Sequence, residues 1–170
     1  MSHKEQRNYC KRMQMTFPAQ FIGKSVLDVG SMDVNGSNRW LFRDACYTGI
    51  DISPGRNVDR VCKVQDLAEV FDFVISTEVL EHDPEWWVTL DEMCKRVRPG
   101  GSLLVTCAGP GRAEHGTRRC PVGGMVCDSD YYLNLSVVHL LSVVSKHPWL
   151  HILTEQDGIR HDTRLFGVRS

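Results

Sequence analysis

A short apolar segment that ends in a glycine is the feature that most constrains the fold of this chain. Residues 26–29 read VLDV, with one acid among three apolar side chains, and Gly30 follows directly. A polar run and a second glycine, Gly36, come next. This pattern predicts a buried strand over residues 25–30 that ends in a turn where the backbone approaches a ligand. In an α/β fold, nucleotide-like cofactors bind at such turns, beyond the carboxyl ends of parallel strands.

The charges around this turn discriminate between two classes of cofactor. A dinucleotide fingerprint, G-x-G-x-x-G, has a middle glycine where this chain has Met32. Asp28 and Asp33 add carboxylates, which would repel a pyrophosphate in a site of low dielectric. A ligand with an ammonium group and a sulfonium would be attracted instead. The sequence therefore favours S-adenosylmethionine over NAD, with S-adenosylhomocysteine as the product.

A second predicted strand, over residues 46–52, also ends in an acid. Asp51 follows Gly30 by about twenty residues, the offset at which a carboxylate accepts hydrogen bonds from a ribose. A solvated acid in the turn before Ser53 is the alternative. Because Asp28 and Gly30 precede it, we expect Asp51 to bind the cofactor.

Alternating patterns predict a single α/β domain over residues 1–170. Further strands are expected over residues 58–64, 71–76, 102–108, 149–154 and 163–168. Helices are expected over residues 4–15, from Asp83 to Val97 with Pro84 in the first turn, and over residues 137–146. The first of these lies in an N-terminal helical segment, residues 1–24, and is predicted to cover the cofactor end of the sheet, with a frayed terminus as the alternative. This alternation implies a doubly wound, mostly parallel sheet. The short connections predict trimmed helices.

Composition excludes several classes of protein. A formal net charge of −1 and a pI near 6.6 argue against nucleic acid or an anionic membrane as a partner. No apolar run reaches the roughly 20 residues that span a bilayer, and the first residues lack a signal-peptide core, so we expect a cytoplasmic monomer or homodimer. The seven cysteines form no C-x-x-C pair, which favours reduced thiols. The spacing of Cys120, Cys127 and His115 matches no common structural zinc site.

Several motifs resemble those of class I S-adenosylmethionine-dependent methyltransferases, in particular the group that carries E-V-L-E-H after the fourth strand. These motifs are VLDVGS (26–31), DVNGS (33–37), GIDI (49–52), QDL (65–67), FDFVISTEVLEHDP (71–84) and RPGG (98–101), with weaker matches over residues 106–119 and 130–135. The resemblance implies a Rossmann-like sheet of about seven strands whose last strand is antiparallel.

The same resemblance implies the contacts of the cofactor. Asp66 stands where the family accepts a hydrogen bond from the adenine amino group, and the backbone N–H of Leu67 faces the ring. The cofactor-binding residues expected in all are Asp28, Gly30, Ser31, Asp33, Gly36, Asp51, Ile52, Asp66, Leu67, Ser76, Thr77 and Glu78.

Two histidines are the candidate catalytic residues. Methyl transfer is an in-line displacement in which the protein mainly aligns the acceptor with the methyl group. A hydroxyl acceptor benefits from a base, and His82, just past the fourth strand, belongs to the residue type that titrates near neutral pH. The alternative is that His82 only shapes the pocket. His115, after the fifth strand, is the second candidate.

Residues 109–135 are predicted to form an active-site loop insertion. They follow the fifth strand at the cofactor edge of the sheet, where long loops are usually functional. Arg112 and Arg118 are the candidate substrate-binding residues, because arginine binds planar anions through paired hydrogen bonds. They indicate an acceptor with a carboxylate, a phosphate or an acidic sugar. A solvated basic loop is the alternative.

Three functions follow from these observations. The first is metal-free O-methylation of a small-molecule or glycan acceptor that carries an anionic group. The second arises because E-x-x-E-H resembles the divalent-metal cluster of some small-RNA and quinone-precursor O-methyltransferases. That likeness implies an RNA 2′-O-methyltransferase with Glu78, Glu81, His82 and His115 as ligands, although the near-zero net charge weighs against RNA. The third is a non-catalytic protein that binds S-adenosylmethionine.

Overall fold

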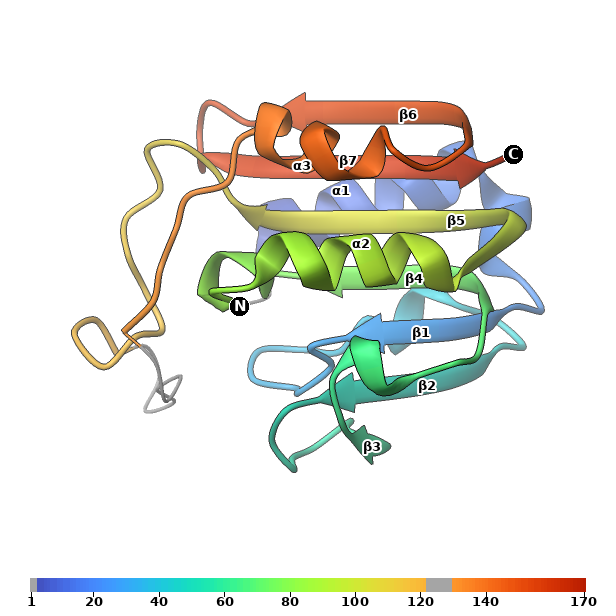
Figure 1. The fold of residues 1–170 in the computed structure, drawn as a ribbon, viewed down its shortest axis with the longest axis horizontal. Helices are drawn as coiled ribbons and strands as arrows, with labels where there is room; N and C mark the ends of the chain where they lie inside the picture. Colours follow the sequence, from blue (N-terminus) through green and yellow to red (C-terminus); the bar gives the residue numbers. More distant parts are fainter. Residues whose placement is uncertain (1–2, 122–129) are drawn as a thin grey trace.

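A seven-stranded sheet forms the centre of the computed structural model, which describes residues 3–121 and 130–170 (Figure 1). Its strands are β1 (Ser25–Val29), β2 (Cys46–Asp51), β3 (Arg60–Val61), β4 (Phe71–Thr77), β5 (Val97–Ala108), β6 (Trp149–Gln156) and β7 (Asp162–Arg169). They lie in the order β3-β2-β1-β4-β5-β7-β6. Strand β7 is antiparallel to β5 and to β6, and the other pairs are parallel. The predicted fold class is confirmed, including the antiparallel last strand.

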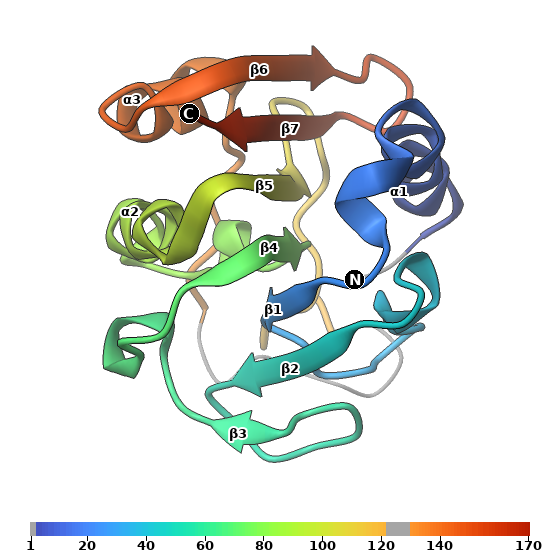
Figure 2. The ribbon, with the colours of Figure 1, turned by 90° about the vertical axis from the view of Figure 1, so that its right-hand side faces the viewer.

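In the part of the chain that the structure describes, three α-helices cover the two faces of this sheet. They are α1 (Lys4–Thr16), α2 (Trp86–Arg96) and α3 (Val137–Val144). Figure 2 shows α1 on one face and α2 with α3 on the other. Each helix buries an apolar stripe: Tyr9 and Met13 of α1 join one core cluster, while Leu90 of α2 and Leu140 of α3 join the second. The central strands are therefore apolar on both faces, as is typical of parallel sheets.

The connections on the β3 side of the sheet are short. Within the described residues, no α-helix follows β1, β2 or β3; three-residue 3-10 turns, Arg39–Leu41 and Val64–Asp66, stand after β1 and β3. This confirms the trimmed helices expected from the sequence. It also means that no helix N-terminus faces the glycine turn after β1, so a pyrophosphate would lack its usual binding dipole and N–H groups.

Some boundaries differ from the expected ones for local reasons. Strand β3 keeps only two residues of the predicted 58–64, because the Asp66 carboxylate accepts a hydrogen bond from the backbone N–H of Lys63 at 2.9 Å and starts a 3-10 turn. Helix α2 begins at Trp86 rather than directly after Asp83. The Asp83 side chain instead closes a turn by accepting a hydrogen bond from the backbone N–H of Glu85 at 2.8 Å.

The lengths of the helices and the state of the cysteines can be compared with the expectations from composition. The longest helix of the described residues, α1, has 13 residues, and none is both long and apolar enough to cross a membrane. The cysteines in the described part of the chain, Cys10, Cys46, Cys62, Cys94, Cys107 and Cys120, are free thiols. Cys127, which was considered with Cys120 and His115 for zinc, lies outside the described residues.

Replacement of Phe73 by alanine tests the aromatic core beneath α1. Phe73 is fully buried, with its ring centroid 4.7 Å from that of Phe21 and 4.9 Å from that of Phe42. We expect Phe73→Ala to lower the free energy of unfolding by about 3–5 kcal/mol, since it removes a large side chain from a packed core. Urea denaturation measures this change. Trp40→Ala, at a side chain 48% exposed, is the control and should change stability little. Equal midpoints for both variants would contradict the assignment of this core.

Candidate cofactor and acceptor site

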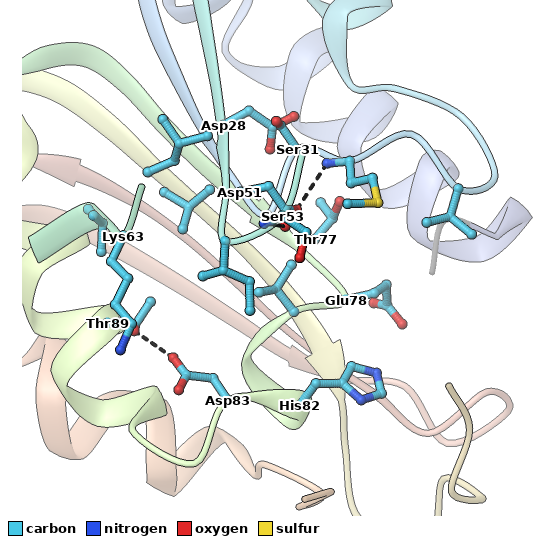
Figure 3. Close-up of a pocket in the computed structure, with 18 of the residues that line it drawn as sticks. Asp28, Ser31, Asp51, Ser53, Lys63, Thr77, Glu78, His82, Asp83 and Thr89 are labelled. Atoms are coloured by element: carbon cyan, nitrogen blue, oxygen red, sulfur yellow. Dashed lines mark hydrogen bonds between the residues drawn. The ribbon is translucent and has the colours of Figure 1, made fainter. Parts of the chain in front are cut away.

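A cavity of about 620 Å³ lies beyond the carboxyl ends of β1, β2 and β4 (Figure 3). The strand order reverses at this point: from β1 the chain continues to β2 and β3 on one side of the sheet, and β4 and β5 lie on the other side. Ligands of open α/β sheets bind at such a switch point. The volume lies within the range of ordinary ligand pockets. Its polar side chains include those of Asp28, Ser31, Asp51, Lys63, Thr77, Glu78, His82, Asp83 and His115.

Asp28 contributes a buried carboxylate to the cavity wall. Its residue is 1% exposed, and Oδ2 accepts hydrogen bonds from the Tyr47 hydroxyl at 2.5 Å and the Asn38 amide at 3.5 Å. Burial raises the pKa of Asp28 to about 6, although these two donors act in the opposite direction. Oδ1 has no hydrogen-bond partner among the described residues. A ligand that brings an N–H donor or a positive charge would satisfy this oxygen.

The turns after β1, β2 and β4 form one continuous wall. The Asp51 carboxylate accepts hydrogen bonds from the backbone N–H of Met32 at 3.3 Å and of Ser53 at 3.1 Å, so it ties the end of β2 to the β1 turn. Gly30 has φ of 77°, and a Cβ at this position would lie 2.2 Å from Cγ2 of Val79. Only glycine therefore allows the β1 turn to pack against the segment that follows β4.

Glu78 stands at the end of β4 in a left-handed conformation, with φ of 59°. Its buried carboxylate accepts a hydrogen bond from the Thr106 hydroxyl at 3.0 Å and lies 3.6 Å from Nε2 of His3. Burial opposes ionisation, but His3 and other positive charges, Arg112 among them, together outweigh it and lower the pKa of Glu78. Burial lowers the pKa of His3 as well, yet the carboxylates of Asp162 and Glu78 raise it to about 9. Both groups are therefore charged at neutral pH.

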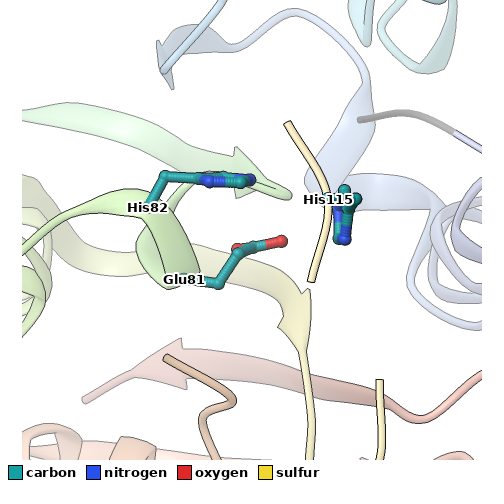
Figure 4. A group of neighbouring side chains, drawn as sticks. All are labelled: Glu81, His82 and His115. Atoms are coloured by element: carbon teal, nitrogen blue, oxygen red, sulfur yellow. The ribbon is translucent and has the colours of Figure 1, made fainter. Parts of the chain in front are cut away.

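Glu81, His82 and His115 form a polar cluster (Figure 4). One potential ligand atom from each side chain lies within 4.8 Å of the others. Both carboxylate oxygens of Glu81, Nδ1 of His82 and Nε2 of His115 lack hydrogen-bond partners among the described residues. Burial lowers the pKa of His82 to about 4 and lowers that of His115, so both rings are neutral at neutral pH. Burial and the charge of Glu78 raise the pKa of Glu81.

Tyr132 is a site residue that the sequence analysis did not identify. Its ring centroid lies 5.3 Å from those of both His82 and His115, and its hydroxyl oxygen lies 3.0 Å from Nδ1 of His115. This contact fixes the orientation of the His115 ring. The weak motif match over residues 130–135 was the only signal for it.

The structure brings most of the predicted cofactor residues together. Those that line the cavity are Asp28, Gly30, Ser31, Gly36, Asp51, Ile52, Thr77 and Glu78. Asp33, Asp66, Leu67 and Ser76 do not line it. Asp33 pairs with Arg56 at 2.6 Å, Asp66 caps its 3-10 turn, and the Ser76 hydroxyl donates to the Val29 carbonyl within the sheet. Lys63, Val64 and Gln65, directly before Asp66, do face the cavity. Cofactor contacts by all twelve residues stay predictions.

The two candidate catalytic histidines line the cavity, whereas the two candidate substrate-binding arginines do not. His82 and His115 both line the cavity, with ring centroids 5.5 Å apart. Arg112 and Arg118 do not line it. The Arg112 guanidinium pairs with the Asp162 carboxylate at 2.5 Å and donates to the Arg160 carbonyl at 3.1 Å, so its donors hold the loop to the sheet.

This fold and cavity define a class I S-adenosylmethionine-dependent methyltransferase. A model of the methyltransferase-domain family matches residues 1–119, and the chain belongs to this family. The human mitochondrial ubiquinone biosynthesis O-methyltransferase is 30% identical to it over 97 residues, which make up 54% of this chain and 25% of that enzyme. The chain thus spans about a quarter of the length of this curated relative.

Solved structures of methyltransferases share the fold at low sequence identity. Magnesium protoporphyrin IX methyltransferase from Synechocystis PCC 6803, with bound S-adenosylmethionine, is 15% identical with a TM-score of 0.66, over 98% of this chain and 80% of that one. The N-terminal domain of EvdMO1, solved in the presence of S-adenosylhomocysteine and D-fucose, is 15% identical with a TM-score of 0.63. The match covers 100% of this chain and 85% of that one. Phosphoethanolamine N-methyltransferase 2 from Haemonchus contortus is 14% identical with a TM-score of 0.64, and the match covers 95% of this chain and 52% of that one.

The residues of the cavity fit S-adenosylmethionine. Three acids, Asp28, Asp51 and Glu78, stand at the ends of three adjacent strands, and one oxygen of Asp28 lacks a hydrogen-bond partner among the described residues. A cationic ligand is attracted to such a wall, whereas a pyrophosphate is repelled. The acid-lined strand ends that the sequence predicted therefore form one shared cavity.

The raised pKa of Asp28 predicts a stability change with pH. Because its folded-state pKa is about 6, above the ordinary 3.8, the stability that Asp28 contributes is present below about pH 4 and is lost as the pH rises through 6. Because asparagine does not ionise, Asp28→Asn should not lose stability as the pH rises through 6. We expect the variant without ligand to gain roughly 2–3 kcal/mol relative to the wild type between pH 4 and pH 7, and to bind the cofactor more weakly. Urea denaturation at several pH values measures it. Asp44→Asn, at an exposed turn, is the control, and a constant difference between Asp28→Asn and the wild type would refute the assignment.

Proposed function

We propose that this protein transfers the methyl group of S-adenosylmethionine to an oxygen atom of a small-molecule acceptor. One observation carries the proposal: the acid-lined cavity at the strand ends also contains His82 and His115, whose rings form a cluster with Glu81. The acids support binding of a sulfonium cofactor. The cluster supports an acceptor whose hydroxyl requires a hydrogen-bond acceptor or a Lewis acid.

The residues of the chain bind and orient the two reactants. Bound S-adenosylmethionine supplies a methyl group on a positively charged sulfur, and the sulfur leaves as a neutral thioether. Asp51 would accept hydrogen bonds from the ribose, and the unpartnered oxygen of Asp28 would accept a donor of the cofactor. The rate enhancement then comes mainly from holding the acceptor oxygen in line with the methyl group.

His82 is suited to orient the acceptor hydroxyl. Because the pKa of His82 is about 4, its imidazole is neutral at neutral pH and one ring nitrogen can accept a hydrogen bond. An imidazole of such low basicity does not retain a proton at neutral pH, so the proton of the hydroxyl would pass on to solvent. His115 and Tyr132 border the same position and would hold the His82 ring in place.

A second candidate is a methyltransferase that uses a divalent metal ion at Glu81, His82 and His115. Four unpartnered ligand atoms on three neighbouring side chains support it, because buried polar atoms without partners are rare. Two neutral imidazoles and a carboxylate form a common ligand set for divalent metals, and a bound metal would lower the pKa of an acceptor hydroxyl. Glu78, the fourth ligand that the sequence resemblance implied, directs its carboxylate to Thr106 and His3 instead.

The acceptor is proposed to be a small molecule or a sugar rather than RNA. Acids such as Asp51, Asp83 and Glu85 line the cavity and would repel a phosphate backbone. The related structures are named for magnesium protoporphyrin IX and phosphoethanolamine, and one was solved in the presence of D-fucose. For an acceptor with an anionic group, the candidate cations are Lys63, which lines the cavity, and the predicted Arg118.

Calorimetry with S-adenosylmethionine and with NAD tests the cofactor. We expect binding of S-adenosylmethionine in roughly the micromolar range and no binding of NAD. Asp51→Asn should weaken binding by about tenfold, since a hydrogen bond to a charged group contributes about 1.5–3 kcal/mol. Asp44→Asn, an exposed acid outside the cavity, should bind like the wild type. Tight binding of NAD alone would overturn the proposal. Binding without release of S-adenosylhomocysteine from any acceptor in a panel would indicate a non-catalytic protein.

Metal titration separates the two mechanisms. If the cluster holds a metal, calorimetry of the protein with Mg²⁺, Mn²⁺ or Zn²⁺ should detect one site, and Glu81→Gln should weaken it by at least about tenfold because a charged ligand is lost. Glu114→Gln is the matched control, because the Glu114 carboxylate pairs with Thr117 and Arg119 outside the cluster. No metal binding, together with turnover that is insensitive to chelators, would leave the metal-free mechanism.

A further inference from the structure

Helix α1 brings His3 against two buried acids behind the cofactor cavity. Nε2 of His3 lies 3.3 Å from Oδ2 of Asp162 and 3.6 Å from Oε2 of Glu78, and Nδ1 lies 3.2 Å from Oε2 of Glu5. Nδ1 also caps α1 by accepting a hydrogen bond from the backbone N–H of Gln6 at 3.3 Å, while Nε2 faces the two buried carboxylates, which favour a protonated ring. The side chains of Glu78 and Asp162 are 0% exposed, so each needs a compensating cation.

The two buried acids depend on His3 to different extents. Asp162 also pairs with Arg112 at 2.5 Å and with Arg164 at 2.9 Å, so it keeps two cations without His3. Among the described residues, the ion pair of Glu78 is with His3. Its Oε2 has no hydrogen-bond partner there, and its other oxygen accepts only from the Thr106 hydroxyl. Loss of His3 would therefore remove the ion pair of the buried Glu78 carboxylate and leave it the weaker interaction with more distant charges such as Arg112.

Glu78 in turn fixes the wall of the cavity. Its backbone is left-handed, a conformation that costs a non-glycine residue about 1–2 kcal/mol and persists only where the surroundings hold it. The next residue, Val79, fills the space above Gly30. If the Glu78 carboxylate moved to reach water, the turn at residues 77–79 would shift against the Gly30 turn, and both line the cofactor cavity.

We propose that His3 is a positioning residue for the cofactor site: its ion pair with Glu78 holds the turn at residues 77–79 and couples the docking of α1 to cofactor binding. This inference rests on the proposed binding of S-adenosylmethionine. His3 touches neither reactant and acts through Glu78. Because coupling between two equilibria is reciprocal, a bound cofactor must also hold α1 more tightly on the sheet.

Calorimetry with S-adenosylhomocysteine tests the role of the charge. We expect His3→Ala and His3→Gln to weaken binding by about tenfold, because one charge-assisted contact is lost. His3→Lys, which keeps a cation, should bind within about threefold of the wild type. Hydrogen exchange provides a second readout: S-adenosylhomocysteine should slow exchange of residues 4–16 in the wild type and in His3→Lys, but less in His3→Gln.

Met13→Ala is the matched control on the same helix. Met13 is buried in the core and does not line the cavity, so its loss should lower the melting temperature without changing the affinity for S-adenosylhomocysteine. A wild type that does not bind S-adenosylhomocysteine would overturn the proposed function itself. A wild type that binds while His3→Ala and His3→Gln bind equally well would overturn only the role of His3. An affinity loss in Met13→Ala as large as that in His3→Ala would also overturn it, since loosening of α1 would then be the cause.

Discussion

The burial of Asp28 within β1 is the constraint on which the site depends. A carboxylate that is fully enclosed by a parallel sheet loses its hydration, and here two donors, Tyr47 and Asn38, contact only one of its oxygens. The other oxygen is buried and has no hydrogen-bond partner in the described chain. The sheet thus keeps an unpartnered acceptor on a residue that lines the cavity, at the cost of stability.

The short connections after β1, β2 and β3 also shape the charge of the cavity. A long helix after β1 would direct its positive end at the cavity and favour an anionic ligand. In this chain, Gly30, Met32 and the 3-10 turn Arg39–Leu41 stand there, and the charge of the site comes from the strand ends. The preference for a cationic cofactor therefore follows both from the acids that are present and from the helix that the described residues lack.

The strands and their acids could be predicted, whereas the long-range contacts could not. Apolar runs mark β1 and β4, and because the carboxyl ends of adjacent parallel strands meet at one edge, Asp28 and Asp51 were expected to share a cavity. The sequence does not encode the partner of an arginine in any local pattern. Arg112 therefore was predicted to bind substrate, although its guanidinium pairs with Asp162, fifty residues away. The contact of His3 with Glu78 escaped prediction for the same reason.

Glu78 and Glu81 show how one motif yields two different carboxyl groups. Both are buried, and they lie three positions apart in E-V-L-E-H. His3 stabilises the charged form of Glu78, whereas for Glu81 burial and the charge of Glu78 outweigh the backbone N–H groups near its carboxyl, so the two pKa values move in opposite directions. Such divergence assigns separate roles to the two acids. Glu78, charged and held, maintains the geometry of the wall, and Glu81, without a partner, is the group that can bind a proton, a metal ion or an acceptor hydroxyl.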